Sequence, residues 1–174
     1  MHLQSTFGFA LIFLFGMVAA AAIPVEVVQM GSKHNLYLLT CTRRSSFSEC
    51  PLLIFCSTEA EAEITYNAIA YFADGPFSTT GAVKPSQIAT TSEPPQPWEG
   101  ISYGAKLGRT GTVTASIDAG AAELESGQIA GLAKLDTEDF VCFKDGKTFF
   151  EVRNELGIRK YSCTTNYWCP SIAA

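Results

Sequence analysis

The chain has 174 residues and a formal net charge of −5 at pH 7, with a pI near 5.0. An acidic chain of this kind is poorly suited to binding phosphate backbones, so we expect no nucleic-acid partner. The 152 residues from Ile23 to Ala174 are enough for one domain with a sizeable core.

The first 22 residues predict a signal peptide. The apolar run "FGFALIFLFGMVAAAA" is short for a membrane span, and Ala20 and Ala22 match the small-residue pattern at which signal peptidase cleaves. We therefore expect residues 23–174 to form a single secreted domain. The alternative is a retained anchor, because Lys and Arg are missing before the apolar run. No second run of that length follows, so we expect no membrane association once the signal is removed.

The predicted domain contains all six cysteines: Cys41, Cys50, Cys56, Cys142, Cys163 and Cys169. An even number of cysteines in a secreted chain predicts disulfide bonds, because the compartment is oxidising. Three lie before residue 57 and three after residue 141, so complete pairing requires an odd number of bridges between the two groups. The spacing of five residues in "CPLLIFC" and "CTTNYWC" fits neither a redox pair nor a zinc hook. We therefore predict structural staples, with no cofactor and no metal.

The elements expected in the first half are short strands and one long loop. Residues 35–42 and 50–56 are apolar runs of strand length. Residues 58–63 carry a capping box and predict a helical turn, whereas residues 64–72 alternate as a strand does. The stretch from 76 to 100 is rich in Pro, Ser and Thr and predicts a long surface loop.

The second half is expected to be strand-rich. Two strand-like segments flank residues 118–127, which predict about two helical turns with Asp118 as cap and Gly127 as stop. Asp145-Gly146 lies between "FVCFK" and "KTFFEV" and predicts a β-hairpin with a type I′ turn. The number of short strands with turn signals predicts a mainly β fold. We expect an antiparallel β-sandwich or barrel with one or two short helices, stapled by disulfides.

Catalytic patterns are present only in fragments. The "GISYG" segment fits G-x-S-x-G around Ser102, but a nucleophile elbow requires a strand before the serine and a helix after it, and neither is indicated. His34 precedes Ser102 and is predicted to be a surface residue. An RNase-type site would require His34 to meet Glu59, Glu61 or Glu63 together with an arginine.

Paired carboxylates are the remaining route to an enzyme, since a small secreted glycan hydrolase needs only two of them. The candidates are Glu99, Asp118, Glu138, Asp139 and Glu151. Their spacing singles out no pair, and we favour a non-enzymatic protein.

Four aromatic residues are candidates for a binding surface: Trp98, Tyr103, Tyr167 and Trp168. Exposed together on one face, they would form stacking platforms for a carbohydrate. The alternative is that Trp98 anchors its loop on the core and that Tyr167 and Trp168 cover a disulfide or the core edge.

The whole organisation resembles the small secreted cysteine-rich proteins of filamentous fungi, many of which act as effectors on a host. The resemblance rests on the leader "FALIFLFGMVAAAA", the size of the chain and the six cysteines. It implies an extracellular, virulence-related protein whose disulfides resist proteases and whose loops bind a host or extracellular protein. The loop at 76–100 and the tip at 167–168 are the expected contact surfaces.

Overall fold

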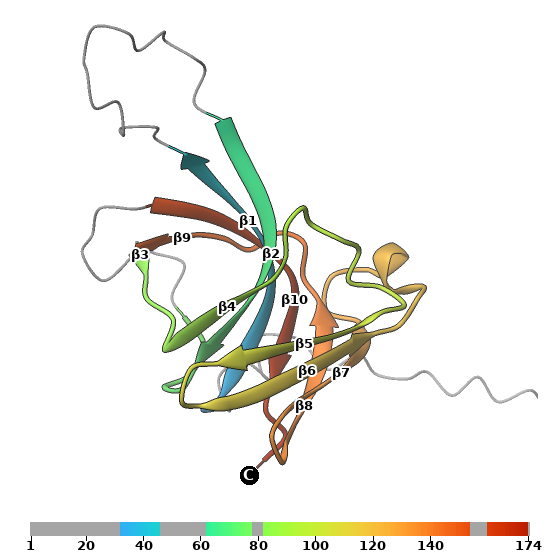
Figure 1. Cartoon of the computed structure of the whole chain (residues 1–174). Coiled ribbons are helices and arrows are strands. Elements are labelled where there is room, and N and C mark those ends of the chain that lie inside the picture. The colour runs from blue at the N-terminus through green and yellow to red at the C-terminus, as the bar shows by residue number, and fades with distance from the viewer. Residues whose placement is uncertain (1–31, 46–61, 78–81, 154–159, 174) are drawn as a thin grey trace, which may run out of the picture.

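A computed structural model describes residues 32–45, 62–77, 82–153 and 160–173 (Figure 1). The predicted signal peptide, the "CPLLIFC" segment with Cys50 and Cys56, and most of the predicted helical turn at 58–63 lie outside these residues. Within the described ranges, no helix is long and apolar enough to cross a membrane.

The described residues form ten β-strands and one short 3₁₀ helix, which confirms the predicted mainly β class. In chain order they are β1 (Asn35–Ser45), β2 (Ala62–Phe72), β3 (Ala82–Val83), β4 (Gln87–Ser92), β5 (Ser102–Leu107), β6 (Gly111–Ile117), η1 (Ala121–Glu123), β7 (Ile129–Leu135), β8 (Glu138–Lys144), β9 (Phe149–Arg153) and β10 (Lys160–Pro170).

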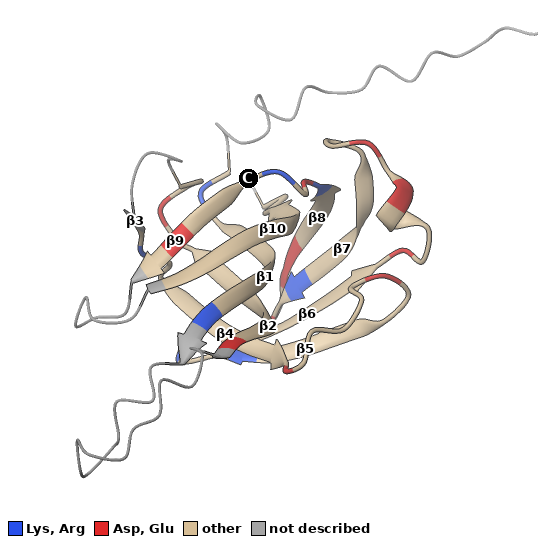
Figure 2. Cartoon of the chain, turned by 90° about the horizontal axis from the view of Figure 1, so that it is seen from above, with Lys and Arg blue, Asp and Glu red and all other residues tan. Residues whose placement is uncertain are grey.

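One sheet holds all ten strands and curls into a nearly closed barrel. Its main path runs β4-β2-β1-β10-β8-β7-β6-β5, and every pairing on this path is antiparallel. The end strands β4 and β5 approach each other, so the strands form a ring when seen from above (Figure 2). The predicted antiparallel, barrel-like architecture is therefore confirmed.

The three longest strands, β1, β2 and β10, carry a hydrophobic core on each face. Alternate side chains of β1 go to opposite sides, and residues 36–39 are buried on both sides, which explains why this part of the strand is apolar in succession. The barrel core lies inside the ring and includes Leu36, Leu38, Ile69, Trp98 and Tyr167. The outer core lies on the opposite face and includes Tyr37, Leu39, Tyr66, Phe150 and Trp168. Strands β5 to β8 alternate between buried and exposed positions because only one face of them is covered.

The sheet divides at the turn between β8 and β9, where the predicted hairpin is wrong. These two strands do not pair with each other; both pair with β10, β8 near Trp168 and β9 near Cys163. The Asp145 carboxylate accepts backbone N–H bonds from Lys147 and Thr148 at 3.1 and 3.0 Å. The Asp-Gly pair therefore lies where the strand beside β10 changes from β8 to β9. From there β9, paired with β3, covers the outer core.

A β-bulge at Asn166 reverses the alternation of side chains along β10, so that residues before and after it no longer follow one pattern of faces. Leu38 pairs with Tyr167 while Leu39 pairs with Thr165, so Asn166 is the extra residue. Without the bulge, Cys163 and Cys169 would share a face, because side chains alternate with a period of two. With it, Cys163 belongs to the outer core and Cys169 to the barrel core.

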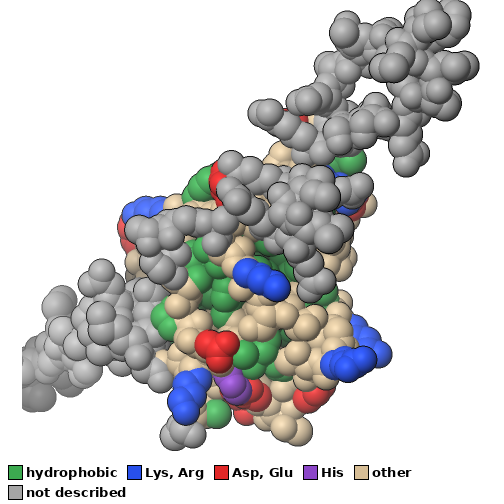
Figure 3. Space-filling model, turned by 90° about the vertical axis from the view of Figure 1, so that its left-hand side faces the viewer, with side chains coloured by type: hydrophobic (Ala, Val, Ile, Leu, Met, Phe, Trp, Pro, Cys, Tyr) green, Lys and Arg blue, Asp and Glu red, His purple; other side chains and the backbone are tan. Residues whose placement is uncertain are grey.

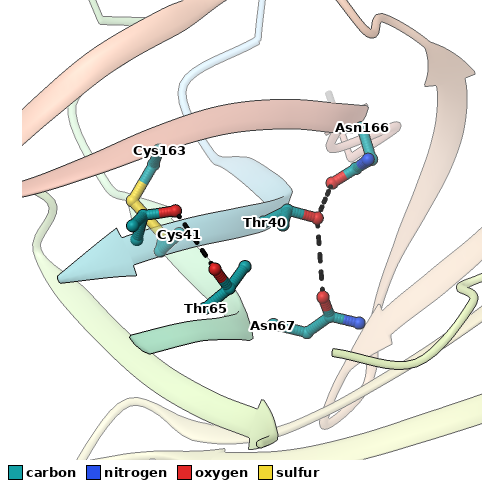
Figure 4. Close-up of a disulfide and its surroundings, with 7 residues drawn as sticks. Thr40, Cys41, Thr65, Asn67, Cys163 and Asn166 are labelled. Carbon is teal, nitrogen blue, oxygen red and sulfur yellow. Dashed lines mark hydrogen bonds between the residues drawn. A yellow bond between two sulfur atoms is a disulfide. The ribbon is translucent and has the colours of Figure 1, made fainter. Parts of the chain in front are cut away.

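Two disulfides tie β10 to its neighbours. Cys41 of β1 bonds to Cys163, and Cys142 of β8 bonds to Cys169. The first joins the two cysteine groups of the sequence, as the parity of the cysteines predicted. Beside it, the Thr40 hydroxyl donates to the side-chain oxygen of Asn166 at 2.8 Å on the opposite face of β1 (Figure 4). The Cys41–Cys163 bond thus lies where β1 and β10 are joined by backbone hydrogen bonds and by a side-chain hydrogen bond.

Three further expected elements differ from the structure. The stretch from 76 to 100 is not loop throughout, because β3 lies in it and β4 pairs with β2. Side-chain burial of Ala89 against the barrel core overrides the Pro-rich composition. The helix expected at 118–127 is only the 3₁₀ turn η1, with Gly120 rather than Asp118 at its cap. Ala62 and Glu63 belong to β2 rather than to a helical turn.

Candidate functional site

A pocket of about 400 Å³ opens on the outer-core side of the sheet. Its walls come from the ends of β1, β2 and β10, from β4 and the segment before it, and from β9. The lining residues are Arg43, Tyr66, Lys84, Pro85, Ser86, Gln87, Ile88, Thr90, Val152 and Tyr161. The volume falls in the range of small-ligand sites. Figure 3 views the molecule from the side on which β3 and β9 lie in Figure 1, and it shows exposed hydrophobic side chains with a basic side chain beside them.

Three side chains from three neighbouring strands organise the pocket. Arg43 and Tyr161 are register partners on β1 and β10. The Arg43 guanidinium lies over the Tyr66 ring at 5.6 Å from its centroid, within the range of a cation–π contact. The rings of Tyr66 and Tyr161 meet edge to face, with centroids 6.4 Å apart. The guanidinium is therefore held from one side by the Tyr66 ring, which in turn contacts Tyr161.

The Cys41–Cys163 disulfide fixes this arrangement. Cys41 and Arg43 are two residues apart on β1, and Cys163 and Tyr161 are two residues apart on β10, so all four lie on one face. Because the disulfide locks Cys41 opposite Cys163, it also locks Arg43 opposite Tyr161. The pocket is therefore built on a part of the sheet whose register is covalently set.

A salt bridge to Glu93 also holds Arg43. The guanidinium Nη2 lies 3.1 Å from one carboxylate oxygen of Glu93 and 3.5 Å from the other. The side chains are 38% and 44% exposed, and ion pairs that exposed contribute about 0.2–1 kcal/mol. The energy is small enough for another carboxylate to replace Glu93.

Tyr66 is almost completely buried, and its environment favours the neutral phenol. Burial, and then the nearby Tyr161, raise its pKa from 10.0 to about 12, although Arg43 opposes the shift. Tyr66 is therefore a protonated phenol at neutral pH. It cannot act there as a base, and its contribution to the site is an apolar ring and a hydroxyl donor.

The shifted pKa of Tyr66 predicts a loss of stability in alkali. Between about pH 10 and 12 the folded chain keeps the phenolic proton that the unfolded chain has released. The free energy of unfolding should fall there by up to about 1.4 kcal/mol per pH unit from this residue. Urea unfolding at roughly pH 9 and pH 11 measures the slope. Because the pKa values of Tyr37, Tyr71 and Tyr167 are raised too, Tyr66→Phe should make the slope less steep without abolishing it. An unchanged slope in this variant would contradict the assignment.

The chemistry available in the pocket is recognition of a negatively charged group. Its charged lining residues, Arg43 and Lys84, are both basic, in a protein whose net charge is −5. An arginine fork and a lysine ammonium suit carboxylates and other oxyanions. Ile88, Pro85 and Val152 add an apolar wall beside them.

No family model, curated protein or solved structure matches this chain. The site must be interpreted from its own geometry.

The four aromatic residues predicted as a binding surface belong mostly to the core. Tyr167 and Trp168 are 0% and 1% exposed, and Trp98 is 3% exposed. A stacking platform built from these three is therefore wrong. The alternative, in which Trp98 anchors its segment on the core, is confirmed. Tyr103 is half-buried and contacts the Trp98 ring at 4.9 Å between centroids.

The predicted catalytic candidates are dispersed. His34 is partly exposed and its Nδ1 lies 2.9 Å from Glu138, a residue that the RNase-type arrangement did not include. Glu63 pairs across from Arg44, at the opposite end of β1 from His34. Ser102 begins β5, so no helix follows it and the elbow is absent, as expected.

Three of the five candidate carboxylates have separate partners. Glu99 accepts the Tyr167 hydroxyl, Glu138 accepts Ser171 and contacts His34, and Asp139 pairs with Lys134 at 3.0 Å. Burial, and then the contact with Glu99, raise the pKa of Tyr167. These three acids therefore support neighbouring elements, and they lie outside the pocket lining.

Sequence reasoning missed the pocket residues. The signal that would have found them is the spacing of Arg43 and Tyr161 from the cysteines, two residues in each case. That spacing becomes informative only when Cys41 is known to bond to Cys163 across antiparallel strands.

Proposed function

We propose that this chain is a secreted, non-enzymatic interaction protein of the effector type, and that it binds an extracellular or host protein through the pocket. Processing after Ala22 and export are part of the proposal. Two disulfides in a β-barrel are compatible with an oxidising extracellular fluid.

The observation that carries the proposal is the Arg43–Tyr66–Tyr161 arrangement beside the Cys41–Cys163 bond. Arginine and tyrosine are residue types that dominate binding energy at protein interfaces, and Arg43 and Tyr161 are both partly exposed, while the buried Tyr66 ring supports them. Here they are ordered before any partner arrives, which lowers the entropic cost of binding. A carbohydrate-binding function has less support, since three of its four proposed aromatic platforms are buried.

The proposal is tested with the oxidised, secreted protein. N-terminal sequencing of protein exported by a eukaryotic host should begin at Ile23. The immobilised protein should then capture a saturable partner from host extracellular fluid, and Arg43→Gln should reduce the captured amount by about tenfold, as expected for loss of a charge-assisted contact. Lys106→Gln, an exposed change on β5, is the matched control.

Two results would overturn the proposal. One is a chain that is retained in the cell with residues 1–22 still attached. The other is partner capture that is equal for the wild type and for Arg43→Gln, which would place the binding surface elsewhere.

A further inference from the structure

We infer that the pocket binds an acidic peptide segment, with a Glu or Asp carboxylate of the partner placed between Arg43 and Lys84. The inference names the ligand class of the proposed site and rests on the proposed binding function. Two basic side chains line the pocket: Arg43 is partly exposed and Lys84 is exposed. The protein as a whole is acidic. A local pair of cations in such a chain selects for an anion at that place.

Glu93 shows which anion the guanidinium accepts. Its two carboxylate oxygens lie 3.1 and 3.5 Å from the Arg43 Nη2. Glu93 is itself outside the pocket lining and 44% exposed, so it can turn into solvent when a ligand arrives. In the free protein, Glu93 therefore uses one N–H group of the Arg43 guanidinium and acts as an internal competitor of an incoming carboxylate.

The aromatic geometry favours a peptide over an acidic sugar. A sugar ring requires an open aromatic face, but the Arg43 guanidinium covers the Tyr66 ring at 5.6 Å. Tyr161 meets the same ring edge to face. The exposed apolar group of the pocket is instead Ile88, which is 41% exposed on β4. An acidic side chain with an apolar neighbour matches this combination of cations and an aliphatic wall.

The inference is tested by calorimetric titration of the oxidised protein with defined probes. The ligand is a blocked hexapeptide of alternating leucine and glutamate, and the matched control is the same peptide with glutamine for glutamate. We expect the acidic peptide to bind at least about tenfold more tightly than the amide peptide, as charge-assisted hydrogen bonds require. An oligomer of galacturonic acid tests the sugar alternative.

Three variants test whether the acidic peptide binds in the pocket. Arg43→Gln should weaken binding of the acidic peptide by about tenfold or more. Glu93→Gln should strengthen it by about two- to fivefold, because the internal competitor is removed. Glu123→Gln, an exposed change in η1, removes the same charge away from the pocket and should leave binding unchanged.

The outcomes separate this inference from the proposed function. Equal binding of the acidic and amide peptides overturns the acidic class, while Arg43-dependent capture of a partner would still support the proposed function. Binding of the galacturonic acid oligomer without the acidic peptide overturns the peptide class in favour of a sugar. Weaker binding in Glu93→Gln overturns the competitor role. Failure of both partner capture and all probes overturns the function and the inference together.

Discussion

Replacing Cys41 and Cys163 together by alanine should lower the free energy of unfolding by about 5 kcal/mol. The bond joins residues 122 apart in sequence, and the chain-entropy account gives about that stabilisation for a loop of this length. Both sulfur positions are fully buried in the outer core, so the substitution does not expose a new polar group. Urea unfolding followed by tryptophan fluorescence measures the change.

The second disulfide is the matched control for this prediction. Cys142 and Cys169 are also fully buried, but the bond joins residues only 27 apart. Loop entropy alone then gives about 3.5 kcal/mol for their joint replacement by alanine. Since packing losses are similar at the two sites, the difference reports the loop length. Equal losses would show that native contacts, rather than entropy of the unfolded chain, dominate both bonds.

The first double variant should also lose binding of the partner. Without the bond, the register that places Arg43 opposite Tyr161 depends on hydrogen bonds and packing alone. The Cys142–Cys169 bond lies in the barrel core, so its removal should leave binding intact in the fraction that remains folded. Binding measured well below each midpoint of unfolding separates this positional effect from unfolding.

Trp98→Ala should destabilise the protein by about 3–5 kcal/mol, the usual cost of truncating a buried tryptophan. The side chain is 3% exposed and belongs to the barrel core, although it follows a Pro-rich segment. Hydrogen bonds to the residues on either side of Trp98 also fix the Pro-rich segment. The Tyr103 hydroxyl donates to the Pro97 carbonyl at 2.8 Å, and Tyr167 donates to Glu99. Thermal or urea unfolding measures the loss.

Two variants make the tryptophan prediction specific. Within the described residues, the Trp98 indole N–H has no hydrogen-bond partner. Trp98→Phe should therefore lose mainly volume and cost clearly less than alanine, about 1–3 kcal/mol. Ile129→Ala removes a side chain that is 64% exposed and should change stability by less than about 0.5 kcal/mol. A Trp98→Ala variant as stable as the wild type would mean that the indole is not part of the core.

The sequence was sufficient for the features that neighbouring residues decide. Apolar runs such as 35–42 and the alternation at 64–72 predicted β1 and most of β2, because side-chain period follows from strand geometry. The parity of the cysteines predicted a bridge between the two ends of the domain, which Cys41–Cys163 provides. The mainly β, antiparallel class followed from the same local signals.

Only the tertiary structure decided which strands meet and which face each side chain takes. Asp145-Gly146 has the local chemistry of a hairpin, yet β8 and β9 both pair with β10 rather than with each other. The bulge at Asn166 places Cys163 and Cys169 on opposite faces of the sheet. The residues around Asn166 carry no sequence signal that predicts a bulge. The pocket combines residues from β1, β2, β4, β9 and β10. Local preferences are set within a few residues, whereas the strand order and the pocket depend on contacts between distant segments, which a single sequence does not reveal.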